Sequence, residues 1–452
     1  MSEIDRLRDH IDENTMEMIK LLKSRTDLVR DIGKLKQDMG MEVADRGREG
    51  QLREKVRELC CELGMETAVG TKLLDFLIRE SIKTQSESRT PFVHIFTRAK
   101  ALEEQGRSII RMEVGEPDFA PDELVRNSMA EAFDLGYRGY GTPKGMPQLR
   151  DGLSKYATTH FGARITRDHI MVTPGARFGC HLAMSLLDPG DEVVMIEPVW
   201  SAYKAIAQDL GMKPAPIHTS LRDRWEPTPD MIQEAADAGA RMLVLNYPNN
   251  PTGRVLPRRV QDKIVDIAAS KDMYILSDEI YRQYAGEGQK SILEYDYEKS
   301  IVVQSFSKAY SMTGFRVGYA MARPHIIDIM SRRQSTLLTS VAEPMQYAAM
   351  RALETDTSDH IRMIASRLDV MSRKAKEMGL DFVKPDGGLY LFVRTGVDGE
   401  LLSQRLLDRG VAVAPGWYFG NYNKYIRLSA CRDEGILIKG MNTIQGVLES
   451  RT

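Results

Sequence analysis

The residues of this sequence that could do covalent chemistry gather in one short segment, 305–316. It reads Ser-Phe-Ser-Lys-Ala-Tyr-Ser-Met-Thr-Gly-Phe-Arg, and so places hydroxyls, an amine and a guanidinium within twelve residues. Lys308 could form a Schiff base with a carbonyl compound. Two further candidates come earlier in the chain, because Asp278 ends the apolar run YILSD and Tyr281 follows three residues later. Together these residues supply an amine, a carboxylate and a phenol.

Two loops add polar and anion-binding groups. Asn250 lies in NNPTG after the run MLVLN, and Gly175-Ala176-Arg177 follows the run HIMVT and opens a helix. The free N–H groups and the dipole at a helix start suit a phosphate. Pyridoxal phosphate needs a lysine, a carboxylate for its pyridine nitrogen, donors for its phenolic oxygen and an anion site. The sequence offers all four, so we expect this cofactor.

The elements that must position these groups are strands alternating with helices. From about Phe92 onward, short apolar runs end in clusters of Gly, Pro, Asn or Ser and are separated by amphipathic stretches. This alternation predicts a mostly parallel sheet covered by helices on both faces. Ligands of such sheets bind beyond the carboxyl ends of the strands, which is where every candidate in this half falls.

The first ninety residues predict a different, all-helical module. They contain no proline before Pro91, and apolar residues recur at helical spacing from Ile4 to Leu35. A helix of that length needs partner helices or a second chain to bury its stripe. Two more helical patterns cover about 47–63 and 66–85, and 86–90 reads as a linker. We therefore expect domains at 1–88 and 89–452, the latter with a large cofactor-binding part at about 140–345 and a small α+β part from the flanking segments.

Composition excludes several classes of protein. The net charge of −2 on 452 residues gives no reason to expect nucleic acid or an anionic membrane as partner. The four cysteines lack metal-ligand spacing, so we expect no metal and reduced thiols. The charged N-terminus does not fit a signal peptide, and no apolar run approaches the ~18 residues of a membrane span. These features predict a soluble, cytoplasmic protein.

Six motifs of the second half resemble the class I aminotransferases of PLP fold type I, over about residues 92–450. The motifs are VGEPDF at 114–119, YGTPKG at 140–145, NNPTG at 249–253, SDEIY at 277–281, SFSKAYSMTGFRVGY at 305–319 and IRLSAC at 426–431. The resemblance implies that Lys308 is the Schiff-base lysine and moves the proton of the 1,3-shift. It implies that Asp278 pairs with the pyridinium nitrogen, and that Asn250 and Tyr281 hydrogen-bond the phenolic oxygen. It implies that the phosphate is bound by Ser305, Ser307, Arg316, Gly175 and Ala176, and that Trp200 stacks on the ring. It implies that Tyr140 reaches the phosphate of the neighbouring subunit. It also implies that Arg427 and Gly115 bind the substrate carboxylate.

Arg177 carries most of the information on specificity. In the subgroup that this sequence most resembles, this position often holds a basic residue that engages the distal carboxylate of the substrate. The alternative is a surface arginine at a helix start. If Arg177 faces the site, the substrate side chain carries negative charge.

The helical module places cations on two faces of its first helix. Arg25 and Lys36 are eleven residues apart and lie within ~20° of one face at about 100° per residue, whereas Arg8 lies about 100° away around the axis. This geometry suits an intertwined dimer in which Arg8 reaches the partner's site. The remaining candidates are Asp45, Arg48 and Glu49 at the start of the second helix and Gln85 at the end of the third.

These seven residues, in register and without a gap, resemble the all-helical chorismate mutase family over residues 3–86. That reaction is pericyclic, so it needs a folded dianion and donors at the ether oxygen rather than an acid or base. The resemblance implies the following roles: Arg8 of the partner and Arg25 bind the carboxylates, Lys36 and Gln85 donate to the ether oxygen, Asp45 and Glu49 hold the ring hydroxyl, and Arg48 supports them.

The fusion predicts a bifunctional enzyme of aromatic amino acid biosynthesis. It would make prephenate from chorismate and transaminate prephenate or an aromatic 2-oxo acid, with glutamate or aspartate as donor, as a homodimer or larger homo-oligomer. One alternative is a broad-range aspartate aminotransferase whose helical module only regulates or dimerises. Another keeps the cofactor but catalyses a different reaction, such as a decarboxylation. A DNA-binding regulator fits poorly, because residues 1–90 hold 17 Lys and Arg against 19 Asp and Glu.

Overall fold

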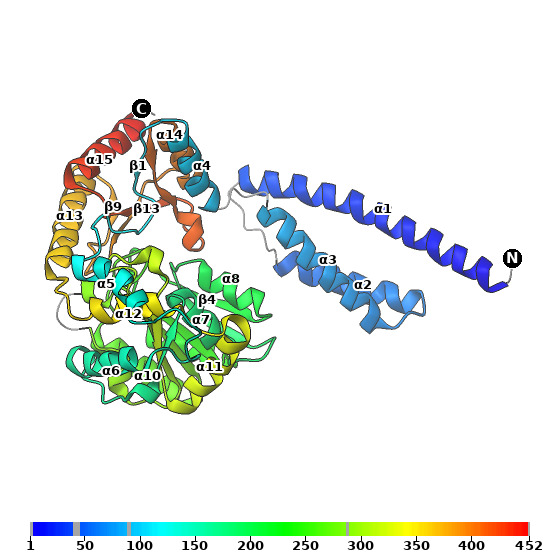
Figure 1. Ribbon diagram of the computed structural model, residues 1–452. Helices are drawn as coiled ribbons and strands as arrows, with labels where there is room; N and C mark the ends of the chain where they lie inside the picture. The colour runs from blue at the N-terminus through cyan, green and yellow to red at the C-terminus, as the bar shows by residue number, and fades with distance from the viewer. Residues whose placement is uncertain (1–2, 39–45, 88–91, 286–288, 451–452) are drawn as a thin grey trace. The chain divides into compact units, whose positions relative to one another are not determined.

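The computed structural model describes residues 3–38, 46–87, 92–285 and 289–450. The chain divides into two compact units, Met1–His94 and Ile95–Thr452. Figure 1 shows the helices and strands of both units along the chain.

The first unit contains the three helices that the apolar periodicity predicts. They are α1 (Glu3–Asp38), α2 (Arg46–Glu62) and α3 (Thr67–Glu87). The α3 helix packs against both α1 and α2, and an ion pair of 2.6 Å joins Arg53 of α2 to Asp75 of α3. Among the described residues, the buried apolar side chains are few: Val29, Cys60 and Leu74. Three helices with so small a core bury little of their apolar surface.

Most of the apolar stripe of α1 stays exposed in the single chain. Ile4, Leu7, Ile11 and Leu21 are each at least 60% exposed. Burying such side chains is worth about 1.5–3 kcal/mol each, so a partner surface would stabilise this helix strongly. The expectation of partner helices is met in part, because α3 packs against α1 but most of the stripe stays exposed.

The second unit is built on a seven-stranded sheet with the order β2-β8-β7-β6-β5-β3-β4. The strands are β2 (Ile170–Thr173), β3 (Glu192–Glu197), β4 (Lys213–His218), β5 (Met242–Asn246), β6 (Tyr274–Asp278), β7 (Ser300–Ser305) and β8 (Gly318–Met321). Strands β4, β3, β5, β6 and β7 run parallel, whereas β8 is antiparallel to both of its neighbours, β2 and β7. The predicted mostly parallel sheet is confirmed.

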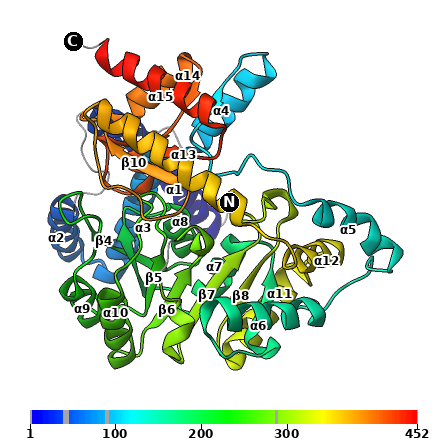
Figure 2. The ribbon, with the colours of Figure 1, turned by 90° about the vertical axis from the view of Figure 1, so that its left-hand side faces the viewer.

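Helices cover both faces of this sheet, as the nearly all-apolar strands predict (Figure 2). Along β5, Leu243 and Leu245 enter one hydrophobic core, while Met242 and Val244 enter the other. The helices of this layered part are α5 (Glu123–Asp134), α6 (Pro147–Phe161), α7 (Ala176–Met184), α8 (Ala202–Asp209), α9 (Pro229–Asp237), α10 (Arg258–Ser270), α11 (Pro324–Leu338) and α12 (Glu343–Ala352). Cores on both faces hold the strand ends rigidly in place.

Two strands lie outside the apolar runs that mark the sheet in the sequence. The β4 strand contains Pro214 and Pro216, which lack an N–H and are tolerated because β4 is an edge strand. The β8 strand follows the lysine segment directly and reverses direction between β2 and β7. Neither position in the sheet is encoded by a local apolar pattern.

A smaller α+β part completes the second unit. Its four-stranded sheet has the order β12-β13-β10-β9, and β1 pairs with β11. Its elements are α4 (Phe92–Glu104), β1 (Ile110–Arg111), α13 (Ser358–Glu377), β9 (Asp381–Phe382), β10 (Tyr390–Arg394), α14 (Gly399–Asp408), β11 (Val411–Ala412), β12 (Ala414–Pro415), β13 (Tyr425–Ser429) and α15 (Glu434–Glu449). Segments from both ends of the unit therefore meet in one small layer.

Within the described ranges, no helix is long and apolar enough to cross a membrane. All four cysteines are free thiols.

Replacing Gly70 by alanine should destabilise the first unit by about 1–3 kcal/mol. A Cβ added at Gly70 would lie 2.3 Å from Sγ of Cys60, which is buried. The double variant Cys60→Ala/Gly70→Ala should recover part of the loss. Gly50→Ala on α2 is the control: nothing lies within 4 Å of its added Cβ, so it should gain roughly 0.5–1 kcal/mol.

Separate melting curves for the two units would measure this effect. All three tryptophans lie at 200 or beyond, so tryptophan fluorescence reports the second unit, while helical circular dichroism reports both. A Gly70→Ala protein whose first unit melts like the wild type would contradict the packing described for α2 and α3.

Candidate active sites

The predicted cofactor residues lie at the carboxyl ends of β5, β6 and β7, which are neighbours in the sheet. Asp278 is the last residue of β6, and Asn250 lies four residues beyond β5. Lys308 lies three residues beyond β7. Gly175 caps α7, which begins just after β2, as expected for a phosphate-binding helix start. Parallel strands thus deliver side chains from distant parts of the sequence to one edge.

Asp278 is buried, and its carboxylate is held from both sides. The Tyr203 hydroxyl donates to Oδ2 at 2.6 Å, the Cys180 thiol lies 3.9 Å from the same oxygen, and the Ile280 N–H donates to Oδ1 at 3.2 Å. Burial raises the pKa of the Asp278 carboxyl above its ordinary value, and the hydrogen bond from Tyr203 opposes that rise. A buried carboxylate of this kind calls for a cationic partner, such as a protonated ring nitrogen.

Lys308 meets the loop that carries Gly115, and Tyr281 meets Tyr390, which lies against the same glycine. The Lys308 ammonium donates to the Gly115 carbonyl at 2.5 Å, and the Tyr281 hydroxyl lies 3.0 Å from the Tyr390 hydroxyl. A Cβ added at Gly115 would lie 1.8 Å from that Tyr390 hydroxyl. Only glycine therefore lets the loop approach the two tyrosines and the lysine this closely.

Arg427 and Asn250 come together although 177 residues separate them. Arg427 is buried on β13, donates to Asn250 Oδ1 at 2.8 Å and also donates to the Glu113 carbonyl. Its guanidinium lies 4.1 Å from the Tyr390 ring centroid. The bond to Oδ1 leaves the Asn250 amide N–H groups to donate elsewhere. A planar guanidinium fixed in this way could bind a carboxylate with two parallel hydrogen bonds.

The residues expected to hold a phosphate also cluster. Ser305 Oγ lies 2.8 Å from Ser307 Oγ, and both serines are buried. Gly175 has a positive φ of 84°, and a Cβ there would lie 2.6 Å from Nη2 of Arg316. Ala176 follows as the first residue of α7. Hydroxyls, a guanidinium and a helix N-terminus therefore converge, as an anion site requires.

Arg177 and Tyr140 are exposed, and Trp200 is half-buried. The Arg177 guanidinium is 4.7 Å from the Trp200 ring centroid, and the side chain of Arg177 is exposed. Trp200 in turn meets the edge of Tyr203 at 5.3 Å. Tyr140 is 93% exposed, so within one chain it is not gathered into the site.

In the helical unit, Arg25 reaches across from α1 to α3. Its guanidinium donates to Ser81 Oγ at 2.7 Å and to the Leu77 carbonyl at 3.2 Å. Gln85 lies one turn further along α3, but its side chain is outside the described residues, as is all of Asp45. The other candidates are Lys36 on α1, Arg48 and Glu49 on α2, and Arg8, which is exposed on the first turns of α1.

Both resemblances are confirmed by comparison with known families. Residues 107–437 match the family described as aminotransferase class I and II, and residues 7–86 match chorismate mutase type II. The chain belongs to the class I and II aminotransferase family. It carries a chorismate mutase type II domain at its N-terminus. Members of the aminotransferase family use pyridoxal phosphate.

Individual relatives agree with this assignment. The chain is 32% identical to an aspartate aminotransferase of Pyrococcus horikoshii over 80% of this chain and 95% of that protein. It is 31% identical to an aspartate/prephenate aminotransferase of Thermus thermophilus over 80% of this chain and 97% of that protein. The solved aspartate aminotransferase of Thermotoga maritima superposes with a TM-score of 0.76 at 31% identity, covering 80% of this chain and 98% of that one.

Three residues of the aminotransferase site escaped the sequence analysis. Tyr203 and Cys180 contact Asp278, and Tyr390 contacts Tyr281 and Arg427. Tyr203 follows Trp200 by three residues, which is a weak local signal for a shared helix face. Nothing local marks Cys180 or Tyr390, because only the tertiary fold brings them to the site.

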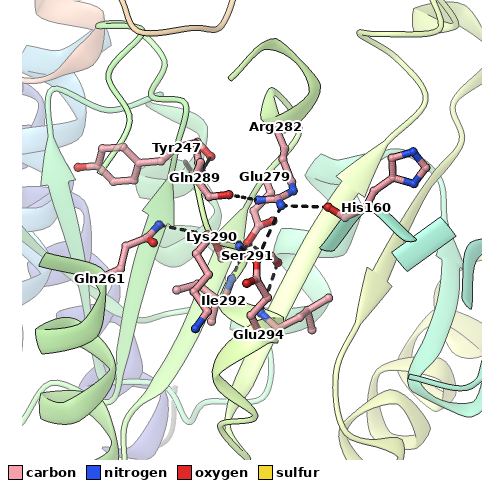
Figure 3. Close-up of polar contacts among 12 residues, drawn as sticks. His160, Tyr247, Gln261, Glu279, Arg282, Gln289, Lys290, Ser291, Ile292 and Glu294 are labelled. Atoms are coloured by element: carbon pink, nitrogen blue, oxygen red, sulfur yellow. Dashed lines mark hydrogen bonds and ion pairs between the residues drawn. The ribbon is translucent and has the colours of Figure 1, made fainter. Parts of the chain in front are cut away.

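A buried acidic residue fixes the segment between Asp278 and Tyr281 in this aminotransferase (Figure 3). Glu279 Oε1 accepts hydrogen bonds from Ser291 Oγ and from the Ile292 N–H, both at 3.0 Å. Arg282 donates to the Gln289 carbonyl at 2.8 Å. These bonds tie the end of β6 to residues 289–292 and so hold the carboxylate and the phenol in place.

Without cofactor, Asp278→Asn should be more stable than the wild type at neutral pH. Burial raises the carboxyl pKa in the folded state, so charging Asp278 costs folding free energy. The cost is complete above the raised folded-state pKa, shrinks as the pH falls through it and vanishes below the ordinary carboxyl pKa.

Melting temperatures of both cofactor-free proteins from about pH 4 to 8 would check this expectation. With pyridoxal phosphate bound, the order should reverse, because the ring nitrogen would supply the missing cation. A wild type that is the more stable protein without cofactor at neutral pH would show that Tyr203 and Ile280 already compensate the charge.

Proposed function

We propose that the chain is a bifunctional enzyme that rearranges chorismate to prephenate and transaminates prephenate, with glutamate or aspartate as amino donor. The observation that carries this proposal is the joining of a chorismate mutase type II domain to an aminotransferase whose relatives include proteins named aspartate/prephenate aminotransferases. Prephenate is the product of the first domain and carries two carboxylates, one for each of two arginines in the second.

In the aminotransferase half, the donor set fits pyridoxal phosphate. Bound there, the cofactor would act as an electron sink for the carbon that loses its proton. Lys308 would hold the cofactor and move the substrate proton, and Asp278 would keep the ring nitrogen protonated. Asn250 and Tyr281 would donate to the phenolic oxygen. The phosphate would be held by Ser305, Ser307, Arg316 and the turn Gly175–Ala176, and Trp200 would stack on the ring.

Two arginines select the substrate. Arg427 binds the α-carboxylate, and its contacts with Asn250, Glu113 and Tyr390 keep the guanidinium oriented before the substrate arrives. Arg177, exposed beside Trp200, meets the second carboxylate. Phenylpyruvate and 4-hydroxyphenylpyruvate lack that carboxylate and are the runner-up acceptors. Oxaloacetate has it, so a broad-range aspartate aminotransferase is the second candidate function.

In the mutase half, the side chains bind and orient a dianion. Arg25 and the partner's Arg8 hold the carboxylates, and Lys36 and Gln85 donate to the ether oxygen where negative charge develops. Asp45 and Glu49 hold the ring hydroxyl, and Arg48 supports them. No proton has to move, so the rate depends on positioning and electrostatics alone.

The mutase half requires a second copy of the chain. Arg8 and Arg25 are seventeen residues apart on one continuous helix, which is about 26 Å along its axis. One helix cannot bring both side chains to one small dianion, whereas an antiparallel partner helix could supply the second arginine. The exposed stripe of α1 offers the apolar surface for that pairing. Tyr140, which is also exposed, would complete the aminotransferase site of the neighbour.

With glutamate as donor, kcat/KM for prephenate should exceed that for phenylpyruvate by at least about tenfold, or about 1.4 kcal/mol. Arg177→Gln should bring the ratio towards one while leaving kcat/KM for phenylpyruvate unchanged, because that acceptor has no second carboxylate. Lys204→Gln, an exposed cation on the neighbouring helix α8, is the control and should change neither value. A wild-type ratio at or below one would favour the aromatic 2-oxo acids as acceptors.

Mixing two inactive mutase variants should restore activity if the site is shared. Chains with Arg8→Ala and chains with Arg25→Ala, co-expressed, form heterodimers in which one of the two sites has both arginines. Random pairing then gives about a quarter of the wild-type activity. Mixing Arg25→Ala with Lys36→Ala is the control, because both side chains come from one chain and no site is repaired.

If the mixture of Arg8→Ala with Arg25→Ala has no more mutase activity than the control mixture, Arg8 acts in the site of its own chain. A wild-type protein without mutase activity would instead make the helical unit a regulatory or dimerisation arm.

A further inference from the structure

A cavity of about 640 Å³ lies in the aminotransferase unit, and none of the candidate site residues lines it. One wall is the turn at 220–222, which follows the edge strand β4. The other wall comes from the small sheet, namely Arg394 at the end of β10 and the segment 421–425 that leads into β13. Its volume is within the range of small-molecule binding sites.

The lining of this cavity is cationic. Arg222, Arg394 and Lys424 line it, and no carboxylate does. Arg394 shares its charge with Asp381 at 3.6 Å, whereas Arg222 and Lys424 have no ion-pair partner among the described residues. The nearest acidic neighbour in sequence, Asp223, is bound by Ser220 Oγ at 2.6 Å. Such a surface attracts an anion.

Aromatic rings form part of the same cavity. Tyr422 and Tyr425 line it, and both pack against Trp225 with centroid distances of 5.6 Å. Tyr425 also stacks on Phe392 at 5.0 Å, and the Tyr422 hydroxyl donates to the Thr219 carbonyl at 2.9 Å. Flat, fixed rings beside cations suit a ligand that has both a ring and a negative charge.

The wall formed by the turn is preorganised. Arg224 and Trp225 adopt positive φ angles of 53° and 61°, which non-glycine residues rarely do. The turn is held by the hydrogen bond from the Trp225 N–H to the Ser220 carbonyl at 2.9 Å and by that from Arg254 Nε to the Arg224 carbonyl at 3.1 Å. This wall of the cavity is therefore held by bonds within the protein.

We propose that this cavity is a second binding site, for a small carboxylate that carries a flat ring. The carboxylate would meet Arg222 and Lys424, and the ring would lie against Tyr425. Tyr425 begins β13 two residues before Arg427, so an occupant contacts the strand that holds the substrate carboxylate. Ring-bearing carboxylates are also the class that the proposed reactions make. Only this choice of natural ligand rests on the proposed function.

Calorimetric titration of the pyridoxal-phosphate-loaded protein with 3-phenylpropanoate tests the proposal. This probe has neither an amino nor an oxo group, so it cannot react and the result does not depend on either enzymatic activity. We expect two sites per chain, one at Arg427 and one in the cavity. Arg222→Glu/Lys424→Glu should remove one of them. Lys155→Glu/Lys376→Glu, which makes the same change in net charge at exposed helix positions, should keep both.

Propanoate and inorganic phosphate, which have no ring, test whether the ring of 3-phenylpropanoate contributes to binding. Propanoate should bind the cavity at least tenfold more weakly than 3-phenylpropanoate. Unchanged unfolding temperatures would establish that both double variants fold. Equal numbers of sites in the wild type and in Arg222→Glu/Lys424→Glu would overturn the proposal, whereas a single wild-type site that this double variant loses would leave the cavity in place and remove only the site at Arg427. Propanoate or phosphate binding as tightly as 3-phenylpropanoate would reduce the cavity to a simple anion site and overturn the ligand class.

Discussion

The buried carboxylate of Asp278 is the constraint around which the aminotransferase unit is organised. A charge at the end of a central strand, enclosed by two hydrophobic cores, is costly unless each oxygen has a partner. Tyr203 and Cys180 from one side and the Ile280 N–H from the other supply those partners. They do not remove the cost entirely, because burial still raises the pKa of the carboxyl. The remaining cost is what a cationic ring nitrogen would relieve.

The need to give buried polar groups hydrogen-bond partners also explains the contacts between the large and small parts of the unit. Arg427 lies on the small sheet, yet it donates to Asn250 beyond β5, and Lys308 beyond β7 donates to Gly115 in the loop after β1. Each bond satisfies a buried or half-buried polar group and also aligns a group that could touch substrate. The packing of the two parts therefore also sets the geometry of the site. The tightest example is Gly115, where an added Cβ would collide with the Tyr390 hydroxyl.

The helical unit differs from the second unit in having only a small core. It buries few side chains and leaves the stripe of α1 exposed, so its stability as a single chain rests on a small contact between three helices. A long helix that separates Arg8 from Arg25 by about 26 Å cannot build a compact dianion site by itself. The exposed stripe leaves this unit a surface for association, whereas the second unit has its own cores.

Local sequence patterns were enough to predict the two classes of fold and most of the side chains at the sheet edge. Apolar periodicity at 3–38 and nearly all-apolar strands such as MLVLN report burial directly, because each depends on residues close together in the chain. Lys308, Asp278 and Asn250 could be found because each follows such a strand. The tertiary structure alone decided that Tyr203 and Cys180 hold Asp278, that Arg427 bonds Asn250, and that β8 runs against its neighbours. These contacts join residues far apart in sequence, and no local pattern encodes which of many buried polar groups will meet.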